Sequence, residues 1–180
     1  LGLSVVYGIV QSYNGAIKVE SNSKTGTSFK IYLPVTDRID VNEQSISNQQ
    51  SEMRGNERIL FVDDEDSIVK LGVRALKRHG YSVTGIQGGT EAWKLFEANP
   101  DGFDLVITDM AMPGMVGSEL AKRILDIRRD IPIIICSGYS EKLEKEKVQN
   151  LKVSAFLDKP LSIDGLIKIT REVLDKNKTE

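Results

Sequence analysis

Polar side chains follow four apolar runs of this sequence, each near the point where the run ends. They are Asp63, Asp64, Asp109, Ser137 and Lys159. If the runs are parallel strands, their carboxyl ends meet at one edge of a sheet, where ligands bind in open sheets of this kind. Clustered carboxylates repel one another, and a divalent cation relieves that repulsion. Oxygen ligands with no His or Cys nearby favour Mg²⁺ or Mn²⁺.

This set of groups suits the transfer of a phosphoryl group onto a carboxylate. Asp109 is the expected nucleophile and would form an acyl phosphate. The cation offsets charge on the phosphoryl oxygens, and Lys159 adds a positive charge. The Ser137 hydroxyl would donate a hydrogen bond to the phosphoryl group once it is present. A purely structural cluster of acids at a strand edge is the alternative.

The elements that must position these groups alternate between strands and helices from residue 57 onward. Apolar strands alternating with helices indicate a parallel sheet covered on both faces. Five such units predict an α/β fold, a five-stranded, parallel, doubly wound, flavodoxin-like sandwich. Strands are expected at residues 59–62, 82–86, 105–108, 131–136 and 155–157, and helices at 66–79, 90–98, 117–128, 141–149 and 163–176.

The residues before this region divide into two further zones. Residues 1–34 carry three Lys and one Glu and predict a helix that ends at Asn14-Gly15, followed by two strands. This short piece has one apolar face and nothing to pack it on. Residues 35–56 carry four acids against two Arg and no aromatic residue, so we interpret them as a flexible linker. A long ordered surface loop is the alternative for that stretch.

Composition excludes several classes of protein. The 180 residues carry 24 Lys and Arg against 26 Asp and Glu, a balance that argues against a nucleic-acid-coating protein. One Cys and one His exclude a disulfide framework and any metal centre that needs two His ligands. No apolar stretch is long enough for a membrane span, and no signal peptide is evident. We therefore expect a cytoplasmic location, with no nucleic-acid partner and no membrane contact by this chain.

The motifs around the acids resemble the receiver domain of two-component response regulators, over about residues 57–176. The resemblance implies that Asp109 accepts a phosphoryl group from a phosphohistidine and that Lys159 binds the phosphate. It also implies a Mg²⁺ site at Asp63 and Asp64, helped by the backbone carbonyl of Ala111. The motifs are Val62-Asp63-Asp64-Glu65, Thr108-Asp109-Met110-Ala111-Met112-Pro113-Gly114, Ser137-Gly138, and Phe156 three residues before Lys159-Pro160.

The same resemblance implies a coupled switch and shows two departures. Ser137 and Phe156 match the switch pair, but Phe156 has no hydroxyl, so its switching would rest on packing. Val116 stands before Gly117, where receivers usually have Asp before Gly. Lys159-Pro160 resembles the cis-proline junction of the family. We interpret the methionines of this region, Met110, Met112 and Met115, as part of a mobile loop at the site.

The first zone resembles the end of a histidine-kinase ATP-binding domain. Gly2 and Leu3 match the end of its Gly-Leu-Gly-Leu element, which faces the nucleotide phosphates, and Thr27 matches a Thr near the adenine pocket. There is no Met at position 1, and a predicted helix begins almost at once. The chain is therefore interpreted as the C-terminal portion of a hybrid sensor histidine kinase, a phosphotransferase that would bind ATP only as the intact parent.

These resemblances imply partners as well as chemistry. The sole His, His79, ends a predicted helix, so the phosphohistidine donor comes from the parent's kinase core or from another kinase. A histidine phosphotransfer protein or a response regulator is the expected downstream acceptor, and weak homodimerisation is left open. The receiver would keep only phosphotransfer and self-dephosphorylation. A stand-alone or degenerate receiver that acts as a docking module is the alternative. A phosphatase with an aspartyl nucleophile is disfavoured, because Ala111 stands where its second Asp should be.

Overall fold

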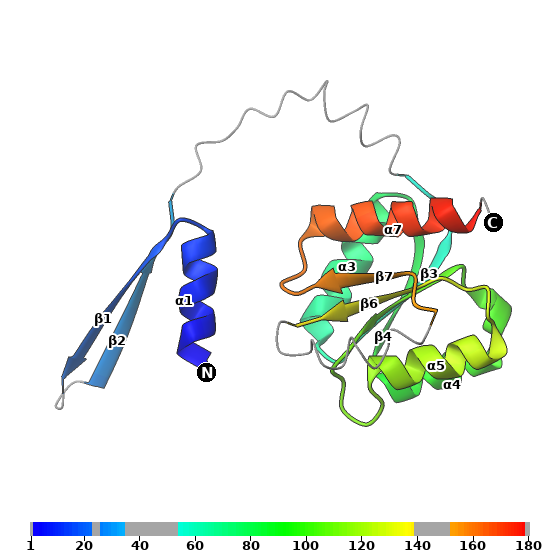
Figure 1. The fold of residues 1–180 in the computed structure, drawn as a ribbon, viewed down its shortest axis with the longest axis horizontal. Helices are drawn as coiled ribbons and strands as arrows, with labels where there is room; N and C mark the ends of the chain where they lie inside the picture. Colours follow the sequence, from blue (N-terminus) through cyan, green and yellow to red (C-terminus); the bar gives the residue numbers. More distant parts are fainter. Residues whose placement is uncertain (1, 23–25, 35–53, 139–151, 179–180) are drawn as a thin grey trace, which may run out of the picture. The chain divides into compact units, whose positions relative to one another are not determined.

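A computed structural model describes residues 2–22, 26–34, 54–138 and 152–178 (Figure 1). The chain divides into two compact units, Leu1–Ile46 and Ser47–Glu180. The helix expected at residues 141–149 lies outside the described residues.

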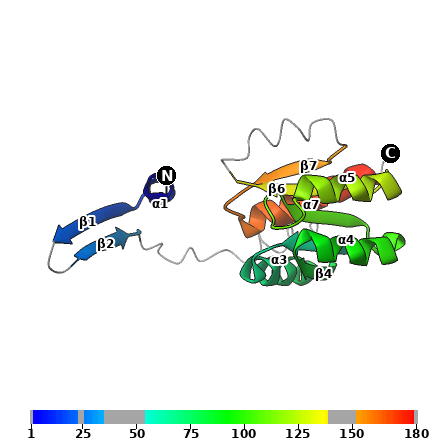
Figure 2. The same cartoon turned by 90° about the horizontal axis from the view of Figure 1, so that it is seen from below.

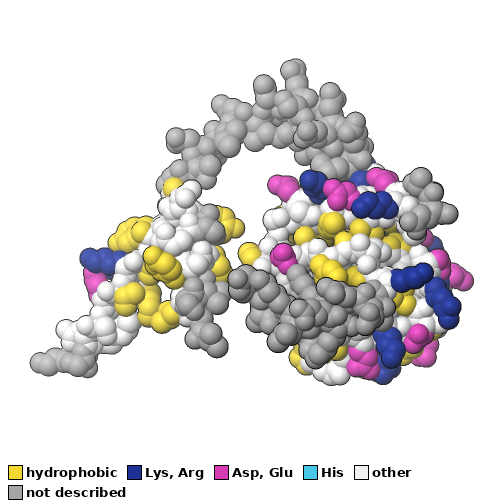
Figure 3. Space-filling view, in the orientation of Figure 1, with side chains coloured by type: hydrophobic (Ala, Val, Ile, Leu, Met, Phe, Trp, Pro, Cys, Tyr) yellow, Lys and Arg dark blue, Asp and Glu magenta, His cyan; other side chains and the backbone are white. Residues whose placement is uncertain are grey.

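The first unit is a helix followed by a hairpin, as the sequence predicts. Helix α1 (Gly2–Ser12) is followed by the antiparallel strands β1 (Ala16–Asn22) and β2 (Gly26–Tyr32). The helix ends at Ser12, and Asn14, two residues further on, takes a positive φ of 53°. Val10 is the one buried side chain among those that the structure describes in residues 2–34. Figure 3 accordingly shows apolar side chains, in yellow, spread over this unit.

The second unit contains a five-stranded, all-parallel sheet of order β4-β3-β5-β6-β7. This confirms the predicted doubly wound α/β fold. Figure 2 shows the strand order from β4 at the bottom of the unit to β7 at the top. The strands are β3 (Arg58–Asp63), β4 (Ser82–Gln87), β5 (Leu105–Asp109), β6 (Ile133–Ser137) and β7 (Ala155–Asp158). The helices are α3 (Asp66–Arg78), α4 (Gly89–Ala98), the short 3-10 turn η1 (Pro100–Gly102), α5 (Gly117–Ile127) and α7 (Ile163–Asn177).

Apolar side chains of alternating strand positions pack on opposite faces of this sheet. On one face Leu60 and Val106 pack with α4 and α5, and on the other Phe61 and Ile107 pack with α3 and α7. Because side chains alternate along a strand, a sheet covered on both faces needs apolar residues at almost every strand position. This need accounts for the unbroken apolar runs in the sequence.

The loop after β5 differs from the sequence interpretation. Met110, Met112 and Met115 are buried and belong to the core on the α4 and α5 side. The interpretation of these side chains as part of a mobile loop is therefore corrected. Flexible thioether side chains fill the irregular space beneath the loop.

An ion-pair network lies at the amino edge of the sheet. Arg171 of α7 donates to both carboxylate oxygens of Glu57 at 3.0 and 3.3 Å, and both side chains are buried. Lys178 Nζ lies 2.7 Å from the same carboxylate. Arg171 also donates to the carbonyl of Arg54 at 3.4 Å, and the Gly55 N–H donates to the carbonyl of His79 at 3.0 Å. The last residues of the predicted linker are thus held on this unit.

Candidate functional site

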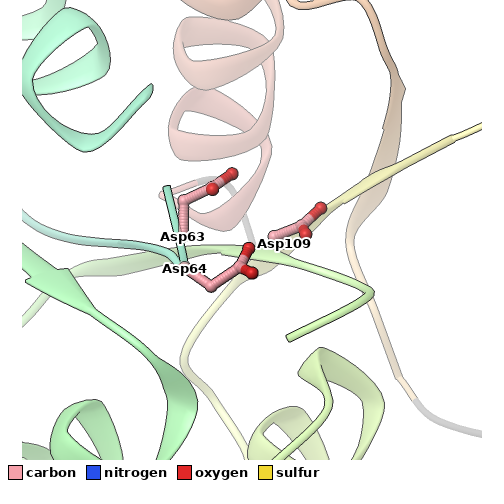
Figure 4. A group of neighbouring side chains, drawn as sticks. All are labelled: Asp63, Asp64 and Asp109. Carbon is pink, nitrogen blue, oxygen red and sulfur yellow. The ribbon is translucent and has the colours of Figure 1, made fainter. Parts of the chain in front are cut away.

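Three carboxylates meet at the carboxyl edge of the sheet, as predicted. Asp63 is the last residue of β3, Asp64 follows it, and Asp109 is the last residue of β5. One oxygen of each lies within 4.8 Å of the other two. Figure 4 shows the three side chains around a common space. Asp63 and Asp109 are buried and Asp64 is half-buried, so the cluster has one side toward solvent.

Lys159 joins two of these acids. Its Nζ lies 3.1 Å from Asp63 Oδ2 and 2.8 Å from Asp109 Oδ1. Burial alone would lower the pKa of Lys159, but the hydrogen bonds and charges of Asp109 and Asp63 outweigh it and raise that pKa. The ammonium is therefore charged at neutral pH. The backbone N–H of Lys159 donates to the Ser137 carbonyl at 2.9 Å, and the Lys159–Pro160 peptide is cis, as the resemblance implies.

Ser137 and Phe156 stand on the two neighbouring strands at this end of the sheet. Ser137 is the last residue of β6 and is fully buried. Its Oγ has no hydrogen-bond partner among the described residues. A buried hydroxyl without a partner is costly, so this atom fits a ligand that enters the site. Phe156 of β7 is half-buried, pairs in register with Ile135 and packs on the α4 and α5 side of the core.

Packing constrains Gly117 much more tightly than Val116. The Gly117 N–H donates to the Met110 carbonyl at 2.9 Å. A Cβ at position 117 would lie 2.0 Å from the Asp109 carbonyl oxygen. This distance is too short for any side chain, so only glycine fits. The glycine therefore lets α5 start directly against the strand that carries Asp109. Val116 is exposed and carries no such constraint.

The remaining predicted site residues lie in two places. Ala111 is exposed on the loop two residues after Asp109, at the acid cluster's edge of the sheet. Gly2 and Leu3 begin α1 in the first unit. Thr27 lies on β2, where its hydroxyl is 2.9 Å from that of Ser21 across the hairpin.

Sequence reasoning missed Gln87, the last residue of β4. Its Nε2 donates to the Asp64 carbonyl at 2.8 Å, and the next N–H, that of Gly88, donates to the Asp63 carbonyl at 3.1 Å. These bonds tie the end of β4 to the loop that holds the two acids. The rule that strand ends meet at one edge places Gln87 there, because it directly follows the strand expected at residues 82–86, but it does not reveal the bond to Asp64.

Cys136 lies beside the site but takes no part in it. Burial raises the pKa of this thiol to about 12, and the charge of Asp109 adds to the increase. A buried thiol in this environment is unreactive.

The acid cluster fits a hard divalent cation. The three side chains offer only oxygen, the donor that Mg²⁺ prefers, and they come from residues held by two neighbouring strands. Lys159 lies close to Asp63 and Asp109. The cluster therefore has the donor set and negative charge that such an ion needs.

Comparison with protein families agrees with this geometry. Residues 59–171 match the response regulator receiver domain, and the chain belongs to that family. The second unit is therefore a receiver domain of two-component phosphorelay signalling, related to the receivers of sensor kinases.

Curated relatives include both large and small proteins. The chain is 33% identical to the sensor kinase CckA of Brucella abortus (strain 2308), over 98% of this chain and 19% of that protein. It is 29% identical to the sensor protein EvgS of Escherichia coli (strain K12), over 92% of this chain and 14% of that protein. The response regulator receiver protein CpdR of Brucella abortus (strain 2308) is 30% identical, over 65% of this chain and 96% of CpdR. The chain thus spans a fifth or less of CckA and of EvgS.

Solved receiver structures share the fold of the second unit. A response regulator receiver domain from Clostridium thermocellum has a TM-score of 0.65 at 26% identity, covering 68% of this chain and 98% of that one. The chemotaxis response regulator CheY4 of Vibrio cholerae has a TM-score of 0.58 at 29% identity, covering 66% and 99%. Within the part of the chain that the structure describes, no helix is long and apolar enough to cross a membrane.

Proposed function

We propose that Asp109 accepts a phosphoryl group from a phosphohistidine on another domain or protein. The observation that carries this proposal is the convergence of three carboxylates on one charged lysine at the open edge of the sheet. An Asp109 oxygen attacks phosphorus, and an O–P bond forms as the N–P bond of the phosphohistidine breaks. The imidazole nitrogen keeps the electron pair of that bond and takes a proton from solvent.

The surrounding residues supply binding and charge. Asp63 and Asp64, with the Ala111 carbonyl, would hold Mg²⁺ or Mn²⁺, which when bound offsets negative charge on the phosphoryl oxygens. Lys159 already lies 2.8 Å from Asp109, so its ammonium can contact a phosphoryl group attached there. The Ser137 hydroxyl then donates to a phosphoryl oxygen. Phe156 would follow this movement by repacking, since it has no hydroxyl of its own.

Acetyl phosphate with Mg²⁺, read by intact mass, tests the proposal. The chain should gain one phosphoryl group, the Asp109→Asn variant should gain none, and removal of Mg²⁺ with a chelator should prevent the gain. Asp126→Asn is the matched control, because Asp126 is an exposed aspartate on α5 away from the site. A chain that gains no phosphate would be a docking receiver. A gain that persists in the Asp109→Asn variant would show that another residue accepts the phosphoryl group.

We also propose that the parent is a sensor histidine kinase whose ATP-binding domain ends in the first unit. The CckA match supports this, because it covers 98% of the chain and so includes the helix and hairpin. The exposed apolar side chains of α1, β1 and β2 fit packing against further parts of such a domain. Gly2 and Leu3 at the start of α1 suit a site for nucleotide phosphates, and Thr27 would lie near the adenine.

The kinase proposal has its own test. The coding sequence upstream of Leu1 should encode the rest of an ATP-binding domain and a helix that carries the phosphorylated His. That kinase core, supplied with radiolabelled ATP, should transfer label to this chain and not to its Asp109→Asn variant. A parent without an ATP-binding domain would contradict the proposal and leave acceptance of phosphate by Asp109 untouched. The label would next pass to a His on a phosphotransfer protein or to a response regulator.

A further inference from the structure

A groove runs between α3 and the edge strand β4, away from the acid cluster. It measures about 690 Å³. Its floor is apolar, formed by Val69, Val73 and Val83 with Gly85. A Cβ at position 85 would lie 2.6 Å from Val73 and 2.7 Å from Val69, so the glycine allows the helix to approach the strand closely.

Basic side chains line the rim of this groove. Lys70, Arg74, Lys77 and Arg78 all lie on it, with Asp66 as the one acid. Asp66 pairs with Lys70. Arg74, Lys77 and Arg78 form no ion pair within the part of the chain that the structure describes. A chain of net charge −2 therefore presents an uncompensated positive rim here.

Strand β4 offers the second half of a binding surface. It pairs with β3 on one side and is the last strand of the sheet on the other, among the described strands. An edge strand presents backbone N–H and C=O groups that a further strand can pair with. Val83 and Gly85 face α3, so an added strand would place every second side chain beneath that helix.

The cations recur along α3 at a somewhat shorter spacing than alternate side chains of a strand. Residues 70, 74 and 77 lie about 6 Å and 4.5 Å apart along a helix axis. Alternate side chains of a strand recur about every 6.7 Å. The difference of about 2 Å between the rise from Arg74 to Lys77 and the strand repeat is within the reach of these long side chains, so carboxylates at alternate positions of an added strand could pair with both.

We propose that this groove docks an extended acidic segment of a partner protein, which adds to β4 as a further strand. The backbone of the segment pairs with the free edge of β4, and its alternate carboxylates pair with Arg74 and Lys77. A nucleic acid is disfavoured because the rim is short and its floor is apolar, whereas phosphate backbones are bound by long basic stripes.

A short, end-capped peptide in which Glu alternates with Val or Thr is the probe. Nuclear magnetic resonance of the full chain should show shifts of the β4 and α3 amides and slower hydrogen exchange along β4. The same peptide with Lys in place of Glu should not bind. The Arg74→Glu/Lys77→Glu variant should bind the acidic peptide at least about tenfold more weakly. The matched control is Lys122→Glu/Arg129→Glu, two exposed positions at α5 and its end, and it should bind normally.

Several outcomes would overturn the proposal. They are equal binding of the acidic and basic peptides, unchanged binding by the Arg74 and Lys77 variant, and amide shifts outside β4 and α3. A DNA duplex that shifts the same amides and displaces the peptide would make the rim a general anion surface. Labelling of the variant by acetyl phosphate checks that it is folded, since neither substituted side chain lies at the acid cluster.

Discussion

At the scale of single residues, Lys159 holds together a cluster that would otherwise repel itself. It lies within 3.1 Å of both Asp63 and Asp109, which are buried. Lys159→Ala should lower the unfolding temperature in a chelator, because two buried carboxylates lose their cation. Mg²⁺ should raise the unfolding temperature more in this variant than in the unsubstituted chain. The rate of phosphorylation by acetyl phosphate should fall at least about tenfold. Thermal scans with and without Mg²⁺ measure the difference, and equal Mg²⁺ effects in both proteins would contradict it.

Gln87 gives a second residue-scale prediction. Gln87→Ala removes the donor to the Asp64 carbonyl. A lost hydrogen bond of about 0.5–1.5 kcal/mol should weaken Mg²⁺ binding by about two- to tenfold through a looser acid loop. Calorimetric titration with Mg²⁺ measures this effect. Gln11→Ala serves as control, since Gln11 also donates to a backbone carbonyl but lies in the first unit. Unchanged affinity in Gln87→Ala would show that the bond does not position Asp64.

The buried thiol provides a third prediction. Because burial raises the pKa of Cys136 to about 12, almost none of it is thiolate at neutral or mildly basic pH. Iodoacetamide should therefore leave the folded chain unmodified and alkylate it rapidly in urea. Mass measurement over time follows both reactions. Rapid alkylation of the folded chain would mean that the strand opens or that the thiol is accessible.

At the scale of elements, the pairing of Glu57 with α7 should make stability depend on pH. Burial alone would raise the pKa of Glu57, but hydrogen bonds from Arg171 and Lys178 lower it to about 2. A lowered folded-state pKa stabilises the fold above the ordinary value of 4.5, and this contribution is lost as pH falls from there toward 2. The shift corresponds to about 3 kcal/mol. Urea unfolding at pH 7 and pH 3 should show a smaller pH difference in Glu57→Gln, and an equal difference in both proteins would contradict the assignment.

The elements themselves were largely predictable, because strands buried on both faces need apolar runs that stand out in a sequence. The expected strand at 131–136 is Ile133–Ser137 in the structure. The strand cannot extend back through Pro132, which has no N–H for a ladder. The acids and Lys159 were found because strand ends meet at one edge. The bond made by Gln87 and the burial of the methionines were missed, because a bond to a backbone carbonyl and the filling of a gap depend on how distant segments pack.

At the scale of the whole molecule, the stability of the receiver unit should not depend on the first unit. The receiver unit has cores on both faces of its sheet, whereas Val10 is the one buried side chain described in residues 2–34. Phe29→Lys/Ile31→Lys, on an exposed stretch of β2, should therefore leave the receiver's unfolding temperature unchanged. In sedimentation experiments the variant should self-associate less than the unsubstituted chain. A lowered receiver unfolding temperature would show that the hairpin supports the second unit.

The fastening of Arg54, Gly55 and Glu57 to α7 and α3 has a mechanical consequence. The chain enters the receiver at the amino edge of the sheet, and the acids lie at the carboxyl edge. Tension on the preceding segment is therefore borne by the Glu57–Arg171 pair and by the first residues of β3. The acid cluster sits at the far end of the strands from that load. A pull on residue 54 would therefore load the amino edge of the sheet, at the opposite end of the strands from the edge that carries the acids.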